Sequence, residues 1–201
     1  SVLVSDPQGM FRADRASAER LLRGEPLAQE YVRLRDSGWV LGADAMLRLR
    51  HGRREEVALP NGFAPRQVRA FLSDRAGDAW VAIAEHGVFR YRAGQWTRQA
   101  LLPPATCTAI AEDAQGRYWF GYASGEVRQL QGGRVRAFAA GDGVQVGRVN
   151  TIHAGAGALL VAGELGIAQW QGARFATLPP SRAPGLRGIT GIAESEDGEL
   201  W

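Results

Sequence analysis

The sequence predicts an all-β protein made of four-stranded antiparallel sheets that repeat about every 40 residues. A Trp, or an apolar residue in its place, recurs as an anchor at Val2, Trp39, Trp80, Trp119, Leu160 and Trp201. Before most anchors stand an apolar stretch and a turn rich in Asp and Gly, and a second apolar stretch begins at the anchor. The 26 Gly residues supply the tight turns that short antiparallel strands need.

The strands follow one another in the same order in each unit. The first strand is predicted at 68–73, 107–112, 149–154 and 189–194, and the anchor then opens the second. A turn containing Gly leads to a third strand at 9–12, 45–49, 87–91, 125–130 and 166–170. A fourth strand follows at 96–100, 135–139 and 175–178. Alternation places Val88 and Arg90 on one side of the sheet, with Phe89 and Tyr91 on the other.

Four short strands joined by tight turns and repeated in this way are typical of β-propeller blades. The predicted units of this single propeller are 1–29 (partial), 30–66, 67–106, 107–147, 148–187 and 188–201 (partial), which is about five repeats. Two interpretations stay open. Either the last strand completes the first blade and closes a five-bladed ring, or the 201 residues are part of a larger propeller, which we favour. Segment 14–24 fits either a strand and turn or a short helix.

The repeated residues are expected to serve the architecture of the blade. The anchor Trp fills the space between neighbouring blades. In the turn from Asp113 to Gly116, the carboxylate can accept a hydrogen bond from its own backbone two residues on. Asp113, Gly116 and Trp119 are therefore assigned to structure and not to chemistry.

Composition excludes several functional classes. The net charge is only +3, and the 24 basic residues, all Arg, are scattered apart from one cluster at 50–54, whereas nucleic-acid binders concentrate positive charge on one face. The single Cys107 excludes an internal disulfide and a Cys-based zinc site. The three His residues fall at different levels of the predicted blades, so we expect no metal site, no cofactor and no catalytic site.

Candidate ligand-binding residues lie where the turns between second and third strands, and the links between blades, are expected to gather on one face. These residues are Arg66, Glu85, His86, Arg148, Asn150, Glu164 and Arg187. Arg binds carboxylates in bidentate geometry. The sequence therefore predicts a small-molecule ligand that is anionic or carbohydrate-like.

The stretches 71–91, 110–130 and 192–201 resemble the two-component regulator propeller repeat. In each of them an apolar stretch leads to a turn that ends in Gly, and a Trp follows three residues after that Gly, which is roughly the pattern of the repeat. The resemblance covers nearly the whole chain and weakens at 152–170, where Leu160 replaces the Trp. In that family the propellers are usually the extracytoplasmic sensor part of membrane receptors, upstream of a transmembrane helix and a histidine kinase or diguanylate cyclase.

The resemblance implies a non-catalytic, periplasmic sensor domain that is tethered to the membrane by segments outside these residues. Ligand binding would shift the arrangement of the propeller, or of a homodimer, and so signal to a membrane helix. Two alternatives stay open. One is a periplasmic enzyme of the streptogramin-lyase type, for which His86 would be the catalytic residue, and the other is a protein–protein interaction scaffold.

Overall fold

A computed structural model describes residues 2–6, 9–13, 37–41, 46–50, 53–155, 158–178 and 188–192. They contain a two-stranded sheet, β1 (Val2–Asp6) and β2 (Gly9–Ala13), and a three-stranded sheet, β3 (Ser37–Leu41), β4 (Met46–Arg50) and β5 (Arg53–Val57). Three four-stranded sheets follow: β6 (Val68–Ser73), β7 (Ala79–Ile83), β8 (Gly87–Arg92) and β9 (Gln95–Arg98); β10 (Cys107–Glu112), β11 (Tyr118–Tyr122), β12 (Val127–Gln131) and β13 (Arg134–Phe138); β14 (Val149–Ala154), β15 (Leu159–Gly163), β16 (Ile167–Trp170) and β17 (Phe175–Thr177).

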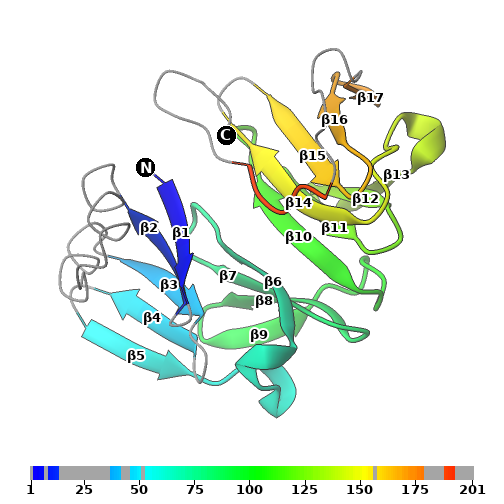
Figure 1. Ribbon diagram of the computed structural model, residues 1–201. Coiled ribbons are helices and arrows are strands. Elements are labelled where there is room, and N and C mark those ends of the chain that lie inside the picture. Colours follow the sequence, from blue (N-terminus) through cyan, green and yellow to red (C-terminus); the bar gives the residue numbers. More distant parts are fainter. Residues whose placement is uncertain are drawn as a thin grey trace.

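Every sheet is an antiparallel meander in which strands pair in chain order. The sheets follow one another around an arc, with β6, β10 and β14 toward its centre and β5, β9, β13 and β17 toward its outside (Figure 1). The central strand β10 contacts both of its neighbours, β6 and β14, directly. This arrangement confirms the predicted all-β propeller. Among the described residues, no helix has the length and hydropathy needed to cross a bilayer.

Most predicted strands agree with the structure to within about two residues. One prediction differs: residues 188–192 form no strand, although the sequence predicts one at 189–194. In place of a paired strand, Gly188 N and Ile189 N donate to Glu164 O and Gly163 O on the preceding blade. The sequence is compatible with either a strand and turn or a short helix at segment 14–24, and this segment lies outside the described residues.

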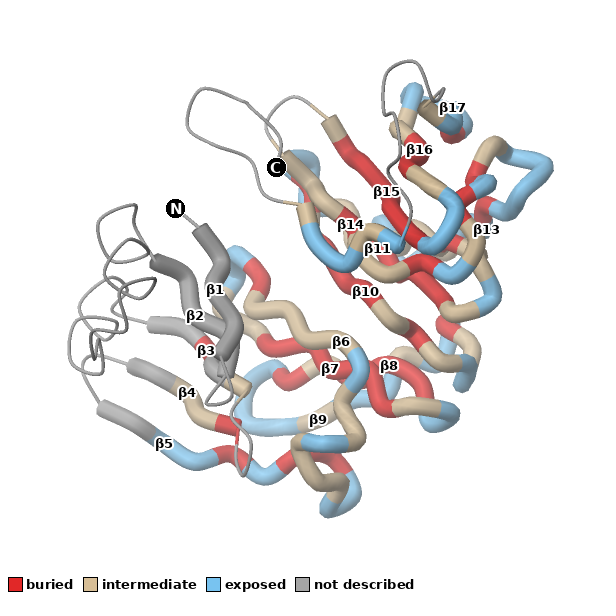
Figure 2. Tube along the Cα trace, viewed as in Figure 1, coloured by how far each residue is buried: buried red, intermediate tan, exposed pale blue. Residues whose placement is uncertain are grey.

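The anchor residues pack against the blade that follows their own. Trp39 shares a buried cluster with β7 and β8, while Trp80 shares one with β10 and β11. Trp119 contributes to the cluster with β14 and β15, and Leu160 to the one with Ile189. Because strand side chains alternate, Val88 faces the same neighbour as Trp80, whereas Phe89 and Tyr91 face the preceding blade, as predicted. Buried residues are accordingly concentrated in the middle strands (Figure 2).

In two blades, β6–β9 and β10–β13, a buried carboxylate closes the turn between the first and second strands. Asp113 Oδ1 accepts hydrogen bonds from Gln115 N and Arg117 N, both at 3.0 Å. Its Oδ2 accepts from Trp119 Nε1 and Arg117 Nε, both at 2.6 Å. This geometry includes the predicted bond two residues on, and it ties the turn to the anchor.

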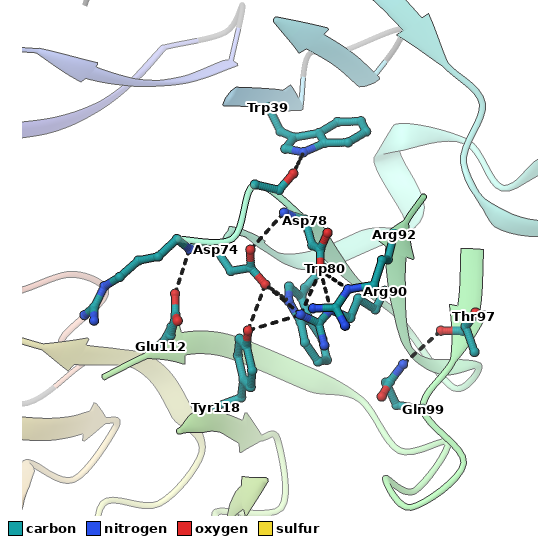
Figure 3. Close-up of polar contacts among 12 residues, drawn as sticks. Trp39, Asp74, Asp78, Trp80, Arg90, Arg92, Thr97, Gln99, Glu112 and Tyr118 are labelled. Carbon is teal, nitrogen blue, oxygen red and sulfur yellow. Dashed lines mark hydrogen bonds and ion pairs between the residues drawn. The ribbon is translucent and has the colours of Figure 1, made fainter. Parts of the chain in front are cut away.

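The carboxylate of Asp74 also accepts hydrogen bonds in such a turn, and one of them comes from the next blade. Its Oδ2 accepts from Trp80 Nε1 at 2.9 Å and from Arg90 Nη2 at 3.3 Å on its own blade. Tyr118 on β11 of the next blade donates its hydroxyl to the same oxygen at 2.8 Å. Asp78, at the other end of this turn, binds Arg90 as well (Figure 3). The network therefore fastens one blade to the next.

Lowering the pH is expected to destabilise the protein through Asp113. Burial alone would raise the pKa of this carboxyl, but the hydrogen bonds from Trp119 and Arg117 outweigh burial and hold the pKa below its ordinary value. The folded-state pKa is thus the lower one. This contribution to the free energy of unfolding is therefore present above about pH 4, the unfolded-state value, and is lost as the pH falls through the folded-state pKa.

Urea titrations of the chain and of Asp113→Asn, each at neutral pH and at about pH 3, measure this contribution. The stability difference between the two proteins should shrink at the lower pH. A difference that does not change with pH would contradict the prediction.

Candidate functional site

One face of the propeller is formed by the turns between second and third strands and by the links that lead into each blade. We call it the turn-and-link face and define it by the turns 84–86, 123–126 and 164–166 and the links 58–67, 99–106 and 139–148. Backbone hydrogen bonds join turn and link within a blade. Ala123 N donates to Thr106 O at 3.0 Å, and Leu165 N donates to Val146 O at 2.9 Å.

Each turn also reaches the segment that enters the next blade. Gly125 has a φ of +85°, and a Cβ at this position would lie 2.8 Å from Gly147 O, so a side chain could not be accommodated without a shift of backbone. Glu164 O likewise accepts a hydrogen bond from Gly188 N at 3.1 Å. The turns are therefore held between successive links, which preorganises the side chains displayed on this face.

Glu85 and His86, both predicted site residues, are exposed in the turn between β7 and β8. Glu85 takes the left-handed conformation, with a φ of 62°. The His86 Nδ1 atom lies 2.7 Å from Ala84 O, and the ring packs edge-on against Phe63, with centroids 4.7 Å apart. Arg98 Nε donates to the His86 carbonyl at 3.1 Å. The imidazole is thus positioned by the turn and by the link of the same blade.

The other predicted site residues are spread over several blades. Arg66 is exposed in the link before β6, and Arg148 is exposed in the link before β14. Glu164 is exposed in the turn after β15, where its backbone N donates to Arg148 O at 3.3 Å. The structure therefore brings Arg148 next to Glu164, and it places Arg66 on the same link as the ring that packs on His86. Arg187 lies outside the described residues.

Asn150 belongs to a recurrent bulge at the start of the central strands. The pairing register shifts between the first and third residues of β6, β10 and β14. The residue between them is Arg69, Thr108 or Asn150. Thr108 Oγ1 donates to Val149 O on the next central strand at 2.5 Å, and Asn150 Nδ2 donates to Ile189 O at 3.0 Å. The amide of Asn150 is thus engaged in joining blades.

Sequence reasoning missed Arg69 and Thr108. The available signal was their common position as the second residue of a predicted first strand. Arg69 differs from the other two bulge residues because its side chain is exposed and makes no hydrogen bond or ion pair within the described part of the chain. It therefore adds an uncommitted guanidinium beside the turn-and-link face.

Cys107, the first residue of β10, is not suited to nucleophilic chemistry. Burial raises the pKa of its thiol to about 12, against a smaller opposing effect of its hydrogen bond to Ala109 O. The reactive thiolate is therefore scarce at neutral pH. Within the described ranges, no three His, Cys, Asp or Glu residues are grouped so that they could hold a metal ion.

Tyr122 pairs with Cys107 across the first two strands and buries its hydroxyl between two blades. That hydroxyl has no hydrogen-bond partner in the described part of the chain. We therefore expect Tyr122→Phe to leave the free energy of unfolding unchanged or to raise it by up to about 1 kcal/mol, since the buried group contributes no bond. Urea denaturation measures the change.

Tyr118→Phe is the matched control, because the Tyr118 hydroxyl donates to the Asp74 carboxylate. Its loss should destabilise the protein by about 1.5–3 kcal/mol. If Tyr122→Phe caused a similar loss, the hydroxyl would have a partner, such as a buried water, and the prediction would be wrong.

Four-stranded antiparallel blades around a common centre, with turns and links gathered on one face, define this chain as a β-propeller protein. No family model and no curated protein matches the sequence. Among solved structures, virginiamycin B lyase from Staphylococcus aureus is similar, with a TM-score of 0.61 and 18% identity over 81% of this chain and 58% of the lyase.

Two further structures share the fold. The extracellular domain of the hybrid two component system BT4673 from B. thetaiotaomicron has a TM-score of 0.59 and 18% identity, over 83% of this chain and 26% of that chain. YCF48 bound to D1 peptide has a TM-score of 0.59 and 12% identity, over 80% of this chain and 55% of that one. At such identities the likeness establishes the β-propeller fold alone.

Proposed function

We propose that this chain is the ligand-sensing, extracytoplasmic domain of a two-component-type receptor, and that the turn-and-link face holds the ligand. Two findings support the proposal: the repeats resemble the two-component regulator propeller, and the fold is shared with the extracellular domain of BT4673. The domain itself would be non-catalytic and periplasmic, and segments outside these residues would tether it to the membrane. A homodimer is one arrangement through which it could signal.

The observation that carries the proposal is the composition of the turn-and-link face. The two large hydrophobic residues that stand out as exposed in the described part of the chain, Leu101 and Leu165, both lie on it, with 57% and 63% of their surface accessible. Arg66 and Arg148 are exposed on it without a hydrogen bond or ion pair among the described residues. Apolar groups beside uncommitted cations are typical of a surface that binds.

Signalling would follow from differential binding. A ligand that contacts two successive turns or links binds one relative arrangement of blades better than another, and it shifts the population by the difference in affinity. At the boundary where Gly188 N donates to Glu164 O, a hydrogen bond crosses from one blade to the next, so this part of the face would respond to such a change.

Calorimetric titration of the chain with a panel of small sugars and organic acids tests the proposal. A compound that binds saturably, and more weakly to Arg148→Gln than to Arg174→Gln, would support it. Arg174 is a suitable control because it is exposed at an outer hairpin, away from the turn-and-link face. If Arg148→Gln and Arg174→Gln bind every compound as the parent chain does, the proposed site is wrong.

A lyase of the streptogramin type is the second candidate, because the fold is shared with virginiamycin B lyase and because His86 is exposed on the same face. Its Nδ1 atom contacts Ala84 O, and its Nε2 atom has no partner in the described part of the chain. Turnover of quinupristin by the chain, lost in His86→Ala, would favour the enzyme over the sensor. Binding of a protein, with no response to small molecules, would favour an interaction scaffold.

A further inference from the structure

Two arginines flank the start of the central strand β6. Arg66 precedes the strand in a short 3-10 turn, and Arg69 occupies the bulge at its second residue. Both are exposed, and neither forms a hydrogen bond or ion pair among the described residues. Three residues span at most about 11 Å, so two long Arg side chains on this stretch can reach a common anion.

Most other arginines with described side chains have partners. Carboxylates bind Arg90, Arg92, Arg117 and Arg128, backbone carbonyls bind Arg75, Arg98 and Arg136, and Arg48 stacks on Trp39. Besides Arg66, Arg69 and Arg148, the uncommitted ones are Arg134 and Arg174, at hairpin tips on the outside of the arc. Among the arginines with described side chains, the free positive charge on the turn-and-link side is therefore concentrated at the starts of central strands.

The residue at the bulge of β6 differs from the bulge residues of the next two central strands in charge and in hydrogen bonding. In the next two blades the bulge residue is neutral, and its side chain donates to a carbonyl of the following blade, Val149 O for Thr108 and Ile189 O for Asn150. Arg69 makes no such bond and stays exposed. No described residue occupies its donors, which leaves them for a molecule from solution.

The backbone that carries Arg66 is ordered before any ligand arrives. Gln67 N donates to Ala64 O at 2.9 Å, and Gln67 Oε1 accepts from Ala64 N at 2.8 Å, which closes the turn on both sides. Glu85 is the carboxylate in the exposed turn of the same blade, and it forms no ion pair with either Arg in the structure. Preorganised and uncompensated donors lower the cost of binding an anion.

We infer that Arg66 and Arg69 form an anion site that recognises the carboxylate of an acidic sugar or a free inorganic oxyanion. The inference rests on the proposed function and names the ligand chemistry of its face. Each guanidinium presents a planar set of donors that matches two oxygens of a carboxylate or sulfate. A neutral sugar offers no such charge and would bind more weakly.

Isothermal titration at constant ionic strength, with glucuronate, glucose and sulfate as probes, tests the inference. Glucuronate should bind better than glucose, and Arg69→Gln and Arg66→Gln should each weaken glucuronate binding roughly tenfold or more, since a charged hydrogen bond is lost. Arg134→Gln, which removes an uncommitted charge at an outer hairpin, should leave binding unchanged. Sulfate binding comparable to that of glucuronate would identify a free oxyanion as the preferred source, whereas preference for glucuronate would identify the acidic sugar.

Three results would overturn the inference. One is no binding of glucuronate or sulfate at millimolar concentration. Another is equal weakening by Arg134→Gln, which would reveal only general charge attraction. The third is glucose binding that equals glucuronate binding and ignores Arg69→Gln; in that case the anion site fails while the proposed sensor function stands. Circular dichroism of each variant shows whether the fold is intact.

Discussion

Trp119→Ala should lower the free energy of unfolding by about 3–5 kcal/mol. The indole is fully buried and lies in an aromatic cluster with Phe138, Trp170 and Phe175, whose ring centroids are 5.9, 5.1 and 5.9 Å away. Its truncation would leave a cavity between two blades and deprive the Asp113 carboxylate of a hydrogen bond at 2.6 Å. Urea denaturation followed by far-ultraviolet circular dichroism measures the loss.

Leu101→Ala is the matched control, because Leu101 is a large apolar residue with 57% of its surface accessible. Its truncation should change stability by no more than about 0.5 kcal/mol. Trp119→Phe should fall between the two, since it keeps most of the ring packing and loses the indole N–H. If Trp119→Ala and Leu101→Ala lowered the free energy of unfolding by similar amounts, the indole would not stabilise the packing between blades.

The sequence was sufficient to predict the blade because its information is local. Trp119 and its equivalents mark the second strand, and the Asp turn before most anchors marks where the first strand ends. The alternation also predicted that Val88 and Phe89 lie on opposite sides of the sheet, and the two side chains do belong to different clusters. Even the substitution of Leu160 for Trp left the position facing the following blade. The spacing of the repeats and the alternation of strand side chains persist when one residue is replaced, because both depend on backbone geometry.

Polar contacts between blades could not be predicted, because they depend on register. Nothing in the sequence distinguishes Tyr118 from other strand residues, yet its hydroxyl donates a hydrogen bond to Asp74 in the preceding blade. The bulge at Arg69, Thr108 and Asn150 depends on a register shift that no single residue encodes. For the same reason, the sequence selected Asn150 as a ligand-binding residue, whereas its amide binds Ile189 O.

The candidate site was predictable as a region but not as a set of contacts. Placing Glu85, His86, Arg148 and Glu164 in turns and links followed from the strand order, which also determines the end of the blade at which a turn lies. Which arginines remain free is a property of the folded chain. Arg128 is paired with Glu126 two residues away, whereas Arg148 is exposed and unpaired among the described residues. Only the three-dimensional structure distinguishes a paired arginine from an unpaired one.

Asp74→Ala should cost about 3–5 kcal/mol, because a buried acceptor with donors from two blades is removed. The carboxylate is 3% exposed as a residue and takes hydrogen bonds from Trp80, Arg90 and Tyr118 (Figure 3). Without it the indole N–H is buried and unpaired, and the Arg90 charge keeps only Asp78 as an acidic partner. Asp142→Ala is the control, since this exposed carboxylate accepts one local bond from Ala139 N at 3.0 Å, and its loss should cost about 1 kcal/mol.

A double-mutant cycle separates the contribution between blades from the contribution within one. Tyr118→Phe removes the bond that crosses to Asp74 and the bond that the hydroxyl accepts from Arg90 Nη2 at 3.3 Å. Asp74→Ala removes the bond from Tyr118 together with those from Trp80 and Arg90. The double variant should therefore be less destabilised than the sum of the two single variants, by about 0.5–3 kcal/mol. Additive losses would mean that the bond from the Tyr118 hydroxyl to Asp74 does not help to hold the two blades together.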